Sequence, residues 1–175
     1  PTPSDSHPKL THAERVIDGK SGATKGQLAD YYVSVADWLL PTLKDRPLAL
    51  VRAPEGIAGE LFFQKNAHGL ALASVDSQKG ESVIVINSVK ALLEAVQMNT
   101  VELHSGNAKV PEVERPDRFV LDLDPDPALP WKSMVEATQL ILTLLDELGL
   151  TSFIKTSGGK GVHIVVPLTR RDSWD

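Results

Sequence analysis

Two aspartates separated by one residue, Asp122 and Asp124, are the sharpest chemical feature of the sequence. They close an apolar segment, 118–124, whose composition predicts a β-strand. Alternate side chains of a strand share a face, so we expect both carboxylates opposite Phe119 and the core. Adjacent ionised carboxylates repel, and a divalent cation such as Mg²⁺ or Mn²⁺ removes that repulsion while preferring oxygen ligands. The spacing therefore predicts a metal site, and a solvated acidic pair before a proline-rich turn is the alternative.

A glycine-rich segment near the end of the chain is the second feature. Residues 157–161 read Ser-Gly-Gly-Lys-Gly, and His163 follows them. Adjacent glycines allow backbone amides to converge on an anion, and Lys160 adds positive charge. The segment lacks the spacing of a Walker loop and precedes a strand instead of a helix. Ser157, Lys160 and His163 together favour triphosphate binding, whereas a glycine hairpin with a structural histidine is the alternative.

Aromatic and basic residues in the first half of the chain give weaker signals. Phe62 and Phe63 are adjacent on a predicted strand, where one ring normally enters the core and the other points outward. An outward ring is a stacking platform for an unpaired base, although two core or interface phenylalanines are the default interpretation. Arg15 and Lys25 could hold a phosphate group, or they could be ordinary surface cations.

Composition limits the possible classes of protein. The chain has 175 residues, 42% of them hydrophobic, 18 basic against 23 acidic side chains, a net charge of −5 and no cysteine. These values favour one folded domain without disulfides or zinc–thiolate sites, in a reducing compartment such as the cytoplasm. No apolar run is long enough to suggest a membrane partner. The acidic balance argues against a protein that coats nucleic acid generally, but it leaves room for a local cationic surface.

The elements that must position these residues follow from periodicity and capping signals. Thr24 and Gln27 form a capping-box pattern before a helix that we expect Pro41 to end. Ser88 is expected to cap a second helix, and a long amphipathic helix is predicted from about Trp131, with apolar residues Val135, Leu140, Ile141, Leu144, Leu145 and Leu148. Strands are predicted at 48–52, 61–65, 82–86, 101–104, 118–124, 152–156 and 162–166. This order predicts an α+β fold with a mixed, mainly antiparallel sheet flanked by helices.

Several ordered stretches together resemble the polymerase domain of bacterial ligase D, a member of the archaeo-eukaryotic primase superfamily that serves non-homologous end joining. The similarity begins at 10–16 and runs across nearly the whole chain. Its better-defined stretches are TKGQLADYY (24–32), GELFFQK (59–65), ELH (102–104), RPDRFVLDLDP (115–125) and KTSGGKGVH (155–163). The resemblance implies a primase-like polymerase core that transfers nucleotides, directed by a template, to DNA ends in double-strand break repair.

The resemblance also implies a role for individual residues. Asp122 and Asp124 match the catalytic carboxylates that hold Mg²⁺ or Mn²⁺. The implied contacts to the incoming nucleoside triphosphate are Arg52, His104, Ser157, Gly158, Gly159, Lys160 and His163. Phe62 and Phe63 match the pair that packs against the templating strand, and Arg15 and Lys25 match the pocket for the 5′-phosphate of a DNA end. The implied partners are DNA ends, a Ku-like end-binding protein and a ligase domain.

One departure from the family pattern concerns length. The family's polymerase domain extends beyond residue 175, and its third metal carboxylate lies in that further stretch. We therefore expect a flexible leader at 1–9 and, at 10–175, the N-terminal part of a polymerase domain, truncated at its C-terminus. Two alternatives follow: a non-catalytic fragment that binds 5′-phosphorylated DNA ends, and a phosphatase of the haloacid-dehalogenase type. The phosphatase family expects Thr or Val where this chain has Asp126.

Overall fold

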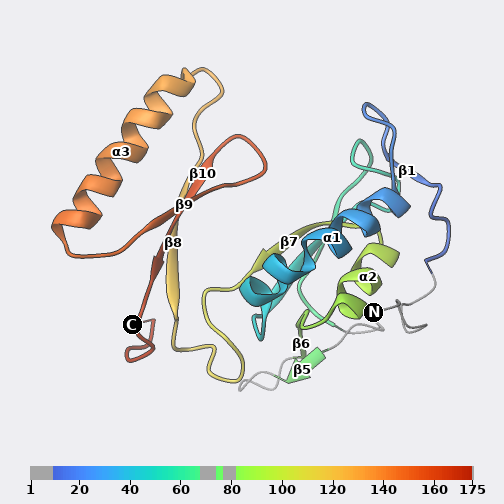
Figure 1. Cartoon of the computed structure of the whole chain (residues 1–175), viewed down its shortest axis with the longest axis horizontal. Helices are drawn as coiled ribbons and strands as arrows, with labels where there is room; N and C mark the ends of the chain where they lie inside the picture. The colour runs from blue at the N-terminus through green and yellow to red at the C-terminus, as the bar shows by residue number, and fades with distance from the viewer. Residues whose placement is uncertain (1–9, 68–73, 77–81, 175) are drawn as a thin grey trace. The chain divides into compact units, whose positions relative to one another are not determined.

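A computed structural model describes residues 10–67, 74–76 and 82–174 of the chain (Figure 1). The predicted leader at 1–9 lies outside these residues. The chain divides into two compact units, an N-terminal unit that ends at Val113 and a C-terminal unit that begins at Glu114. Each unit has its own hydrophobic core, so each is described by itself.

The N-terminal unit opens with a small hairpin and a long helix. Strands β1 (Val16–Asp18) and β2 (Ala23–Thr24) pair antiparallel, and α1 (Lys25–Leu43) follows at once. The predicted capping box of Thr24 and Gln27 is confirmed. The prediction that Pro41 ends the helix is wrong, because the backbone N–H of Lys44 still donates to the carbonyl of Leu40, at 2.9 Å, beyond the proline. A proline removes its own N–H but not those that follow it.

The main sheet of this unit is centred on β3 (Leu48–Arg52). It pairs antiparallel with β4 (Phe62–Gln64), β6 (Ser82–Ile84) and β7 (Thr100–Ser105), and β5 (Ser74–Asp76) pairs with β6. Helix α2 (Val89–Gln97) is capped by Ser88 as predicted. One face of the sheet packs with α1 and α2 around the fully buried Leu50, Ile84 and Leu92. Because side chains alternate along a strand, Val51 and its cross-strand partners Phe63 and Glu102 lie on the opposite face.

The C-terminal unit is a three-stranded antiparallel sheet with one helix. Its strands are β8 (Arg118–Leu123), β9 (Phe153–Thr156) and β10 (Val162–Pro167), with β10 in the centre, and α3 spans Trp131–Glu147. Phe119, Leu121 and Leu123 pack with Leu145 and Ile164, as predicted for the apolar face of β8. Asp122, the one carboxylate within β8, therefore lies on the face away from this core.

The rotation of α3 differs from the apolar pattern predicted for it. The buried residues of the helix are Met134, Thr138 and Leu145, whereas Leu140, Leu144 and Leu148 are exposed by 62%, 49% and 72%. Leucines occur on two sides of this helix, so hydrophobic periodicity alone does not indicate which side meets the sheet.

The predicted class, α+β with antiparallel sheets and flanking helices, is confirmed. Every strand pairing in the described part of the chain is antiparallel, and the strands form three sheets where the sequence suggested one. The short strands β1, β2 and β5 were not predicted. Among the residues that the structure describes, no helix is both long and apolar enough to cross a membrane.

Candidate functional site

Strand pairing brings the two chemical motifs of the C-terminal unit together. Asp122 of β8 lies directly opposite His163 of β10, and 3.3 Å separate Asp122 Oδ1 from His163 Nε2. The aspartate side chain is 63% exposed and the imidazole 25%. The sequence placed these residues in separate motifs, and the register of β8 with β10 makes them one acid–imidazole pair.

Gly161 connects the glycine-rich loop to the second aspartate. A Cβ atom added at Gly161 would lie 2.7 Å from Asp124 Oδ1 and 3.1 Å from the carbonyl carbon of Leu123. The same Cβ would lie closest to the carbonyl oxygen of Leu123, so only glycine allows the loop to pass this near the end of β8 and the Asp124 carboxylate. Sequence reasoning assigned no contact to Gly161. The signal was its position one residue before β10, which places it beside the end of β8.

Ser157 organises the loop from within. Its hydroxyl accepts hydrogen bonds from the amides of Gly159 and Gly161, both at 3.2 Å, and donates to the carbonyl of Gly161 at 3.0 Å. Gly158 has a φ of +88°, a left-handed conformation that suits glycine. The amide of Gly159, predicted to face phosphate, is therefore directed at Ser157, and the exposed Lys160 is the charged residue that the loop presents to solvent.

Lys155 is a third member of the Asp122–His163 row that sequence reasoning missed. It lies opposite His163 on β9, so the three side chains share one face of the sheet. Burial lowers the pKa of Lys155 below its usual 10.5, the nearby Arg118 lowers it further, and Asp122 opposes the shift. A predicted β9–β10 hairpin with this register would have placed Lys155 opposite His163.

The predicted metal ligands, Asp122 and Asp124, are two carboxylates near the end of β8. Among the described residues, no group of three or more His, Cys, Asp or Glu side chains could hold a metal ion. Asp122 and Asp124 nevertheless offer exposed carboxylate oxygens, and Gly161 keeps the space beside Asp124 clear of side-chain atoms. Hard cations such as Mg²⁺ use one or two carboxylates and retain several waters. The pair therefore fits such an ion, although the described chain does not complete its ligand set.

The predicted phosphate pocket of the N-terminal unit is built by the β1–β2 hairpin. Arg15 precedes β1 and Lys25 follows β2, and the Lys25 amide donates to the Arg15 carbonyl at 2.8 Å. The Lys25 side chain is only 3% exposed, and its Nζ donates to the carbonyl of Gln97 at 2.8 Å. Burial lowers the pKa of Lys25, with a further lowering from Arg15 and opposition from Glu14. The Arg15 guanidinium is exposed and donates to the carbonyl of Pro54.

Both predicted stacking residues are exposed, Phe62 by 54% and Phe63 by 52%, so the expectation that one ring enters the core is wrong. Among the described residues β4 pairs with β3 along a short segment, and about half of each ring remains exposed there. The ring of Phe63 meets His104 edge-on at 5.8 Å, and Lys65 Nζ lies 5.5 Å from its centre. An exposed ring beside cations suits stacking with a base.

Arg52 and His104 are each held by neighbours within the N-terminal unit. Arg52 donates from Nε to the carbonyl of Met98 at 3.0 Å and from Nη1 to Gln64 Oε1 at 2.9 Å. Its guanidinium carbon lies 5.8 Å from the centre of the Phe62 ring. His104 Nε2 is 2.7 Å from Glu102 Oε2, a partner that sequence reasoning did not identify.

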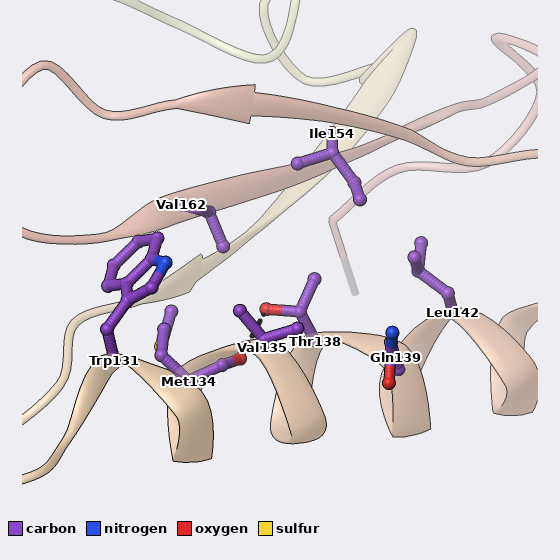
Figure 2. Close-up of a pocket in the computed structure, with 8 residues that line it drawn as sticks. All are labelled: Trp131, Met134, Val135, Thr138, Gln139, Leu142, Ile154 and Val162. Carbon is purple, nitrogen blue, oxygen red and sulfur yellow. Dashed lines mark hydrogen bonds between the residues drawn. The ribbon is translucent and has the colours of Figure 1, made fainter.

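The C-terminal unit also has an apolar pocket between α3 and the sheet (Figure 2). Its volume is about 370 Å³, and it is lined by Trp131, Met134, Val135, Thr138, Gln139, Leu142, Ile154 and Val162. The Thr138 hydroxyl is already bonded to the carbonyl of Met134 at 2.8 Å. No charged side chain lines this pocket, so it does not suit a triphosphate.

Comparison with known proteins gives consistent results. The family model for the LigD primase-polymerase domain matches residues 24–175. The chain is 54% identical to the multifunctional non-homologous end joining protein LigD of Pseudomonas aeruginosa, over 95% of this chain and 21% of that protein. It is 35% identical to the bifunctional non-homologous end joining protein LigD of Bacillus subtilis, over 93% of this chain and 27% of that protein.

A solved structure is similar as well. It is the polymerase domain from Mycobacterium tuberculosis ligase D in complex with DNA, with a TM-score of 0.81 and 30% identity. The match covers 95% of this chain and 63% of that one. The chain thus spans roughly a fifth to a quarter of the curated relatives, at 21% and 27%, and less than two thirds of the solved polymerase domain.

Proposed function

Because this chain belongs to the family of LigD primase-polymerase domains, we propose that it acts in metal-dependent, template-directed nucleotidyl transfer at DNA ends during non-homologous end joining. Its relatives are non-homologous end joining proteins. The observation that carries the proposal is the convergence of Asp122, Asp124, His163 and the glycine-rich loop on one sheet of the C-terminal unit. Acidic and cationic groups side by side are what phosphoryl transfer requires.

Asp122 and Asp124 would hold Mg²⁺ or Mn²⁺. A bound divalent cation supplies Lewis-acid stabilisation of the triphosphate and lowers the pKa of a primer 3′-hydroxyl. The chain's own residues then have distinct tasks. The Asp122 carboxylate would orient the His163 imidazole across the strand pair, on the face that strand register already gives to both residues and to Lys155.

The glycine-rich loop would bind the phosphates of the incoming nucleotide. Lys160 is exposed and supplies a compact positive charge. Ser157 fixes the loop conformation through its three hydrogen bonds, which lowers the entropy that binding must remove. Arg52 and His104, which lie in the N-terminal unit, are also proposed as nucleotide contacts, on the basis of the family resemblance alone.

The N-terminal unit would bind the DNA end. Arg15 and Lys25 are proposed to hold its 5′-phosphate, a contact that positions DNA without reading sequence. Phe62 and Phe63 are proposed to stack on template bases, consistent with their exposure. The similar structure from M. tuberculosis is a complex with DNA, which supports DNA binding by this chain. A Ku-like protein and a ligase domain are the proposed partners.

A second candidate function is DNA-end binding without catalysis. It is favoured by one observation: no third His, Cys, Asp or Glu side chain joins Asp122 and Asp124 among the residues that the structure describes. The two candidates share the 5′-phosphate pocket and differ only in nucleotide addition.

The test is Mn²⁺ titration of the chain and of its Asp122→Asn variant, followed by primer extension on a DNA duplex with a recessed end. We expect Asp122→Asn to weaken Mn²⁺ binding by more than about tenfold, because changes even beyond the direct ligands cost that much. Asp126→Asn is the matched control, since Asp126 is exposed and its carboxylate only accepts from the Ala128 amide in the following turn.

Equal Mn²⁺ affinity in Asp122→Asn and the unaltered chain would refute the metal assignment. Nucleotide addition by the unaltered chain, lost in Asp122→Asn, would support the polymerase function. Binding of DNA ends without addition would support the second candidate.

A further inference from the structure

We propose that Gln97, the last residue of α2, positions the two cations of the 5′-phosphate pocket, Arg15 and Lys25. The inference rests on the proposed function of that pocket. It assigns the task of holding the pocket together to a residue that lies outside the motifs of the sequence.

The first contact is made by the backbone of Gln97. Its carbonyl accepts from Lys25 Nζ at 2.8 Å, a bond that joins residues 72 positions apart. The last carbonyls of a helix have no partner within the helix and carry the negative end of its dipole. The end of α2 therefore fixes a buried ammonium, and this bond uses one of the three N–H donors of the lysine.

The second contact is made by the side chain. Gln97 Oε1 accepts from the backbone amide of Thr11 at 2.9 Å, and Gln97 Nε2 donates to Thr11 Oγ1 at 2.6 Å. This reciprocal pair spans 86 positions of sequence and fastens the segment that leads to Arg15. The half-buried glutamine satisfies both ends of its amide in doing so.

The segment between Thr11 and Lys25 is also held by a hydrogen bond from the start of α1. The amide of Gly26 donates to the carbonyl of Ala13 at 2.8 Å, where a Cβ at Gly26 would lie only 3.1 Å from that oxygen. Arg15 thus lies in a segment held at Thr11 by Gln97 and, through the carbonyls of Ala13 and Arg15, by the first amides of α1. Two like charges repel, so holding both cations near one phosphate position needs fixed anchors of this kind.

The neighbouring carbonyls show that the end of α2 is a general anchor in this unit. Met98 accepts from Arg52 Nε at 3.0 Å, and Asn99 accepts from the amide of Ala53 at 2.8 Å. Gln97 is distinct because its side chain also forms hydrogen bonds, both of them with Thr11. A change in that side chain leaves all three carbonyls in place.

The experiment compares the affinity of the whole 175-residue chain for two duplexes that differ only in a recessed 5′-phosphate or 5′-hydroxyl, by fluorescence anisotropy. Gln97→Ala should lower the ratio of the two affinities by about three- to tenfold, the usual effect of losing one or two hydrogen bonds. Affinity for the 5′-hydroxyl end should not change. Gln139→Ala, at an exposed position of α3, is the matched control.

Thr11→Val supplies a second, milder variant that keeps the backbone amide and removes only the hydroxyl. It should lower the same ratio, and the double variant should lose little more than Gln97→Ala alone, because one interaction is removed in both. This variant also tests the proposal should Gln97→Ala fold poorly.

An unchanged ratio in both variants, in a chain that discriminates between the two ends, would overturn the role of Gln97 and leave the pocket intact. An equal loss of affinity for both ends would likewise overturn it, since that indicates a purely structural role. Equal affinity of the unaltered chain for both ends would refute the proposed pocket itself, and the role of Gln97 with it.

Discussion

Gly161 shows how closely the glycine-rich loop approaches the carboxylate at the end of β8. The predicted anion-binding loop and the predicted metal pair are contiguous through this residue, because a Cβ there would be 2.7 Å from Asp124 Oδ1. A glycine in such a loop suggests backbone freedom, but the φ of Gly161 is not in the left-handed region. Lack of space is therefore the reason for glycine at this position.

We predict that Gly161→Ala displaces Asp124 and β8 locally. The stability cost should be about 1–3 kcal/mol, as for other overpacked sites, and Mn²⁺ affinity should fall as well. Denaturant unfolding and Mn²⁺ titration measure the two effects. Gly159→Ala is the matched control, since its Cβ would meet only Ser157 Oγ at 3.8 Å. Equal behaviour of the two variants would contradict this account of the loop.

The buried ammonium of Lys25 leads to a prediction about pH. Burial and the nearby Arg15 lower the pKa of Lys25 from 10.5, so the unliganded lysine loses its proton at a pH below 10.5. A phosphate monoester is already fully ionised there, with its second pKa at about 6. The preference for a 5′-phosphate end should therefore decline as pH rises, and the decline should begin below pH 10.5.

Anisotropy titrations of the two duplexes from neutral pH upward measure this decline. Lys90→Ala, at an exposed lysine of α2, should leave the profile unchanged. A preference for the 5′-phosphate end that stays constant up to pH 10.5 would contradict this prediction. It would show that the pKa of Lys25 in the chain is not lowered.

Local signals predicted most elements, and their failures have physical causes. The capping residues Thr24 and Ser88 mark both helix starts because an N-cap bond is made within four residues of sequence. The strands β1 and β2 were missed because they are too short for periodicity to register. The rotation of α3 could not be predicted, since it depends on which row of apolar residues the distant strand β10 contacts.

The orientation of α3 is testable with two adjacent leucines. Leu145 is 6% exposed and packs with Ile164 and Val166, whereas Leu144 is 49% exposed. Leu145→Ala should cost about 2–5 kcal/mol of unfolding free energy, as expected for truncation in a core. Leu144→Ala should change it by less than about 0.5 kcal/mol, as at other surface positions. Urea denaturation distinguishes them, and a larger loss for Leu144→Ala would mean that the helix faces the sheet by its other side.

Over the whole molecule, the candidate sites depend on contacts between distant parts of the sequence. The sequence motifs identified Asp122 and His163 as separate signals and already grouped Arg15 with Lys25 as a possible phosphate pocket. Pairing of β8 with β10 places Asp122 beside His163, and pairing of β1 with β2 brings the backbone of Lys25 to that of Arg15. Lys155 and Gln97 escaped sequence reasoning because their importance comes only from strand register and from a bond across 72 positions.

The 5′-phosphate pocket and the Asp122–His163 pair each belong to a single unit of the chain. Arg15 and Lys25 have their hydrogen-bond partners before Val113, and Asp122 has its imidazole neighbour after Glu114. We therefore predict that the two binding activities are separable. Lys25→Met should abolish the 5′-phosphate preference and leave Mn²⁺ affinity unchanged, while Asp122→Asn should do the reverse.

The double variant sharpens this prediction, because independent changes add to within about 0.5 kcal/mol. It should lose as much 5′-phosphate preference as Lys25→Met and as much Mn²⁺ affinity as Asp122→Asn. The same anisotropy and Mn²⁺ titrations measure both losses. Mn²⁺ binding that weakens in Lys25→Met would reveal energetic coupling between the units.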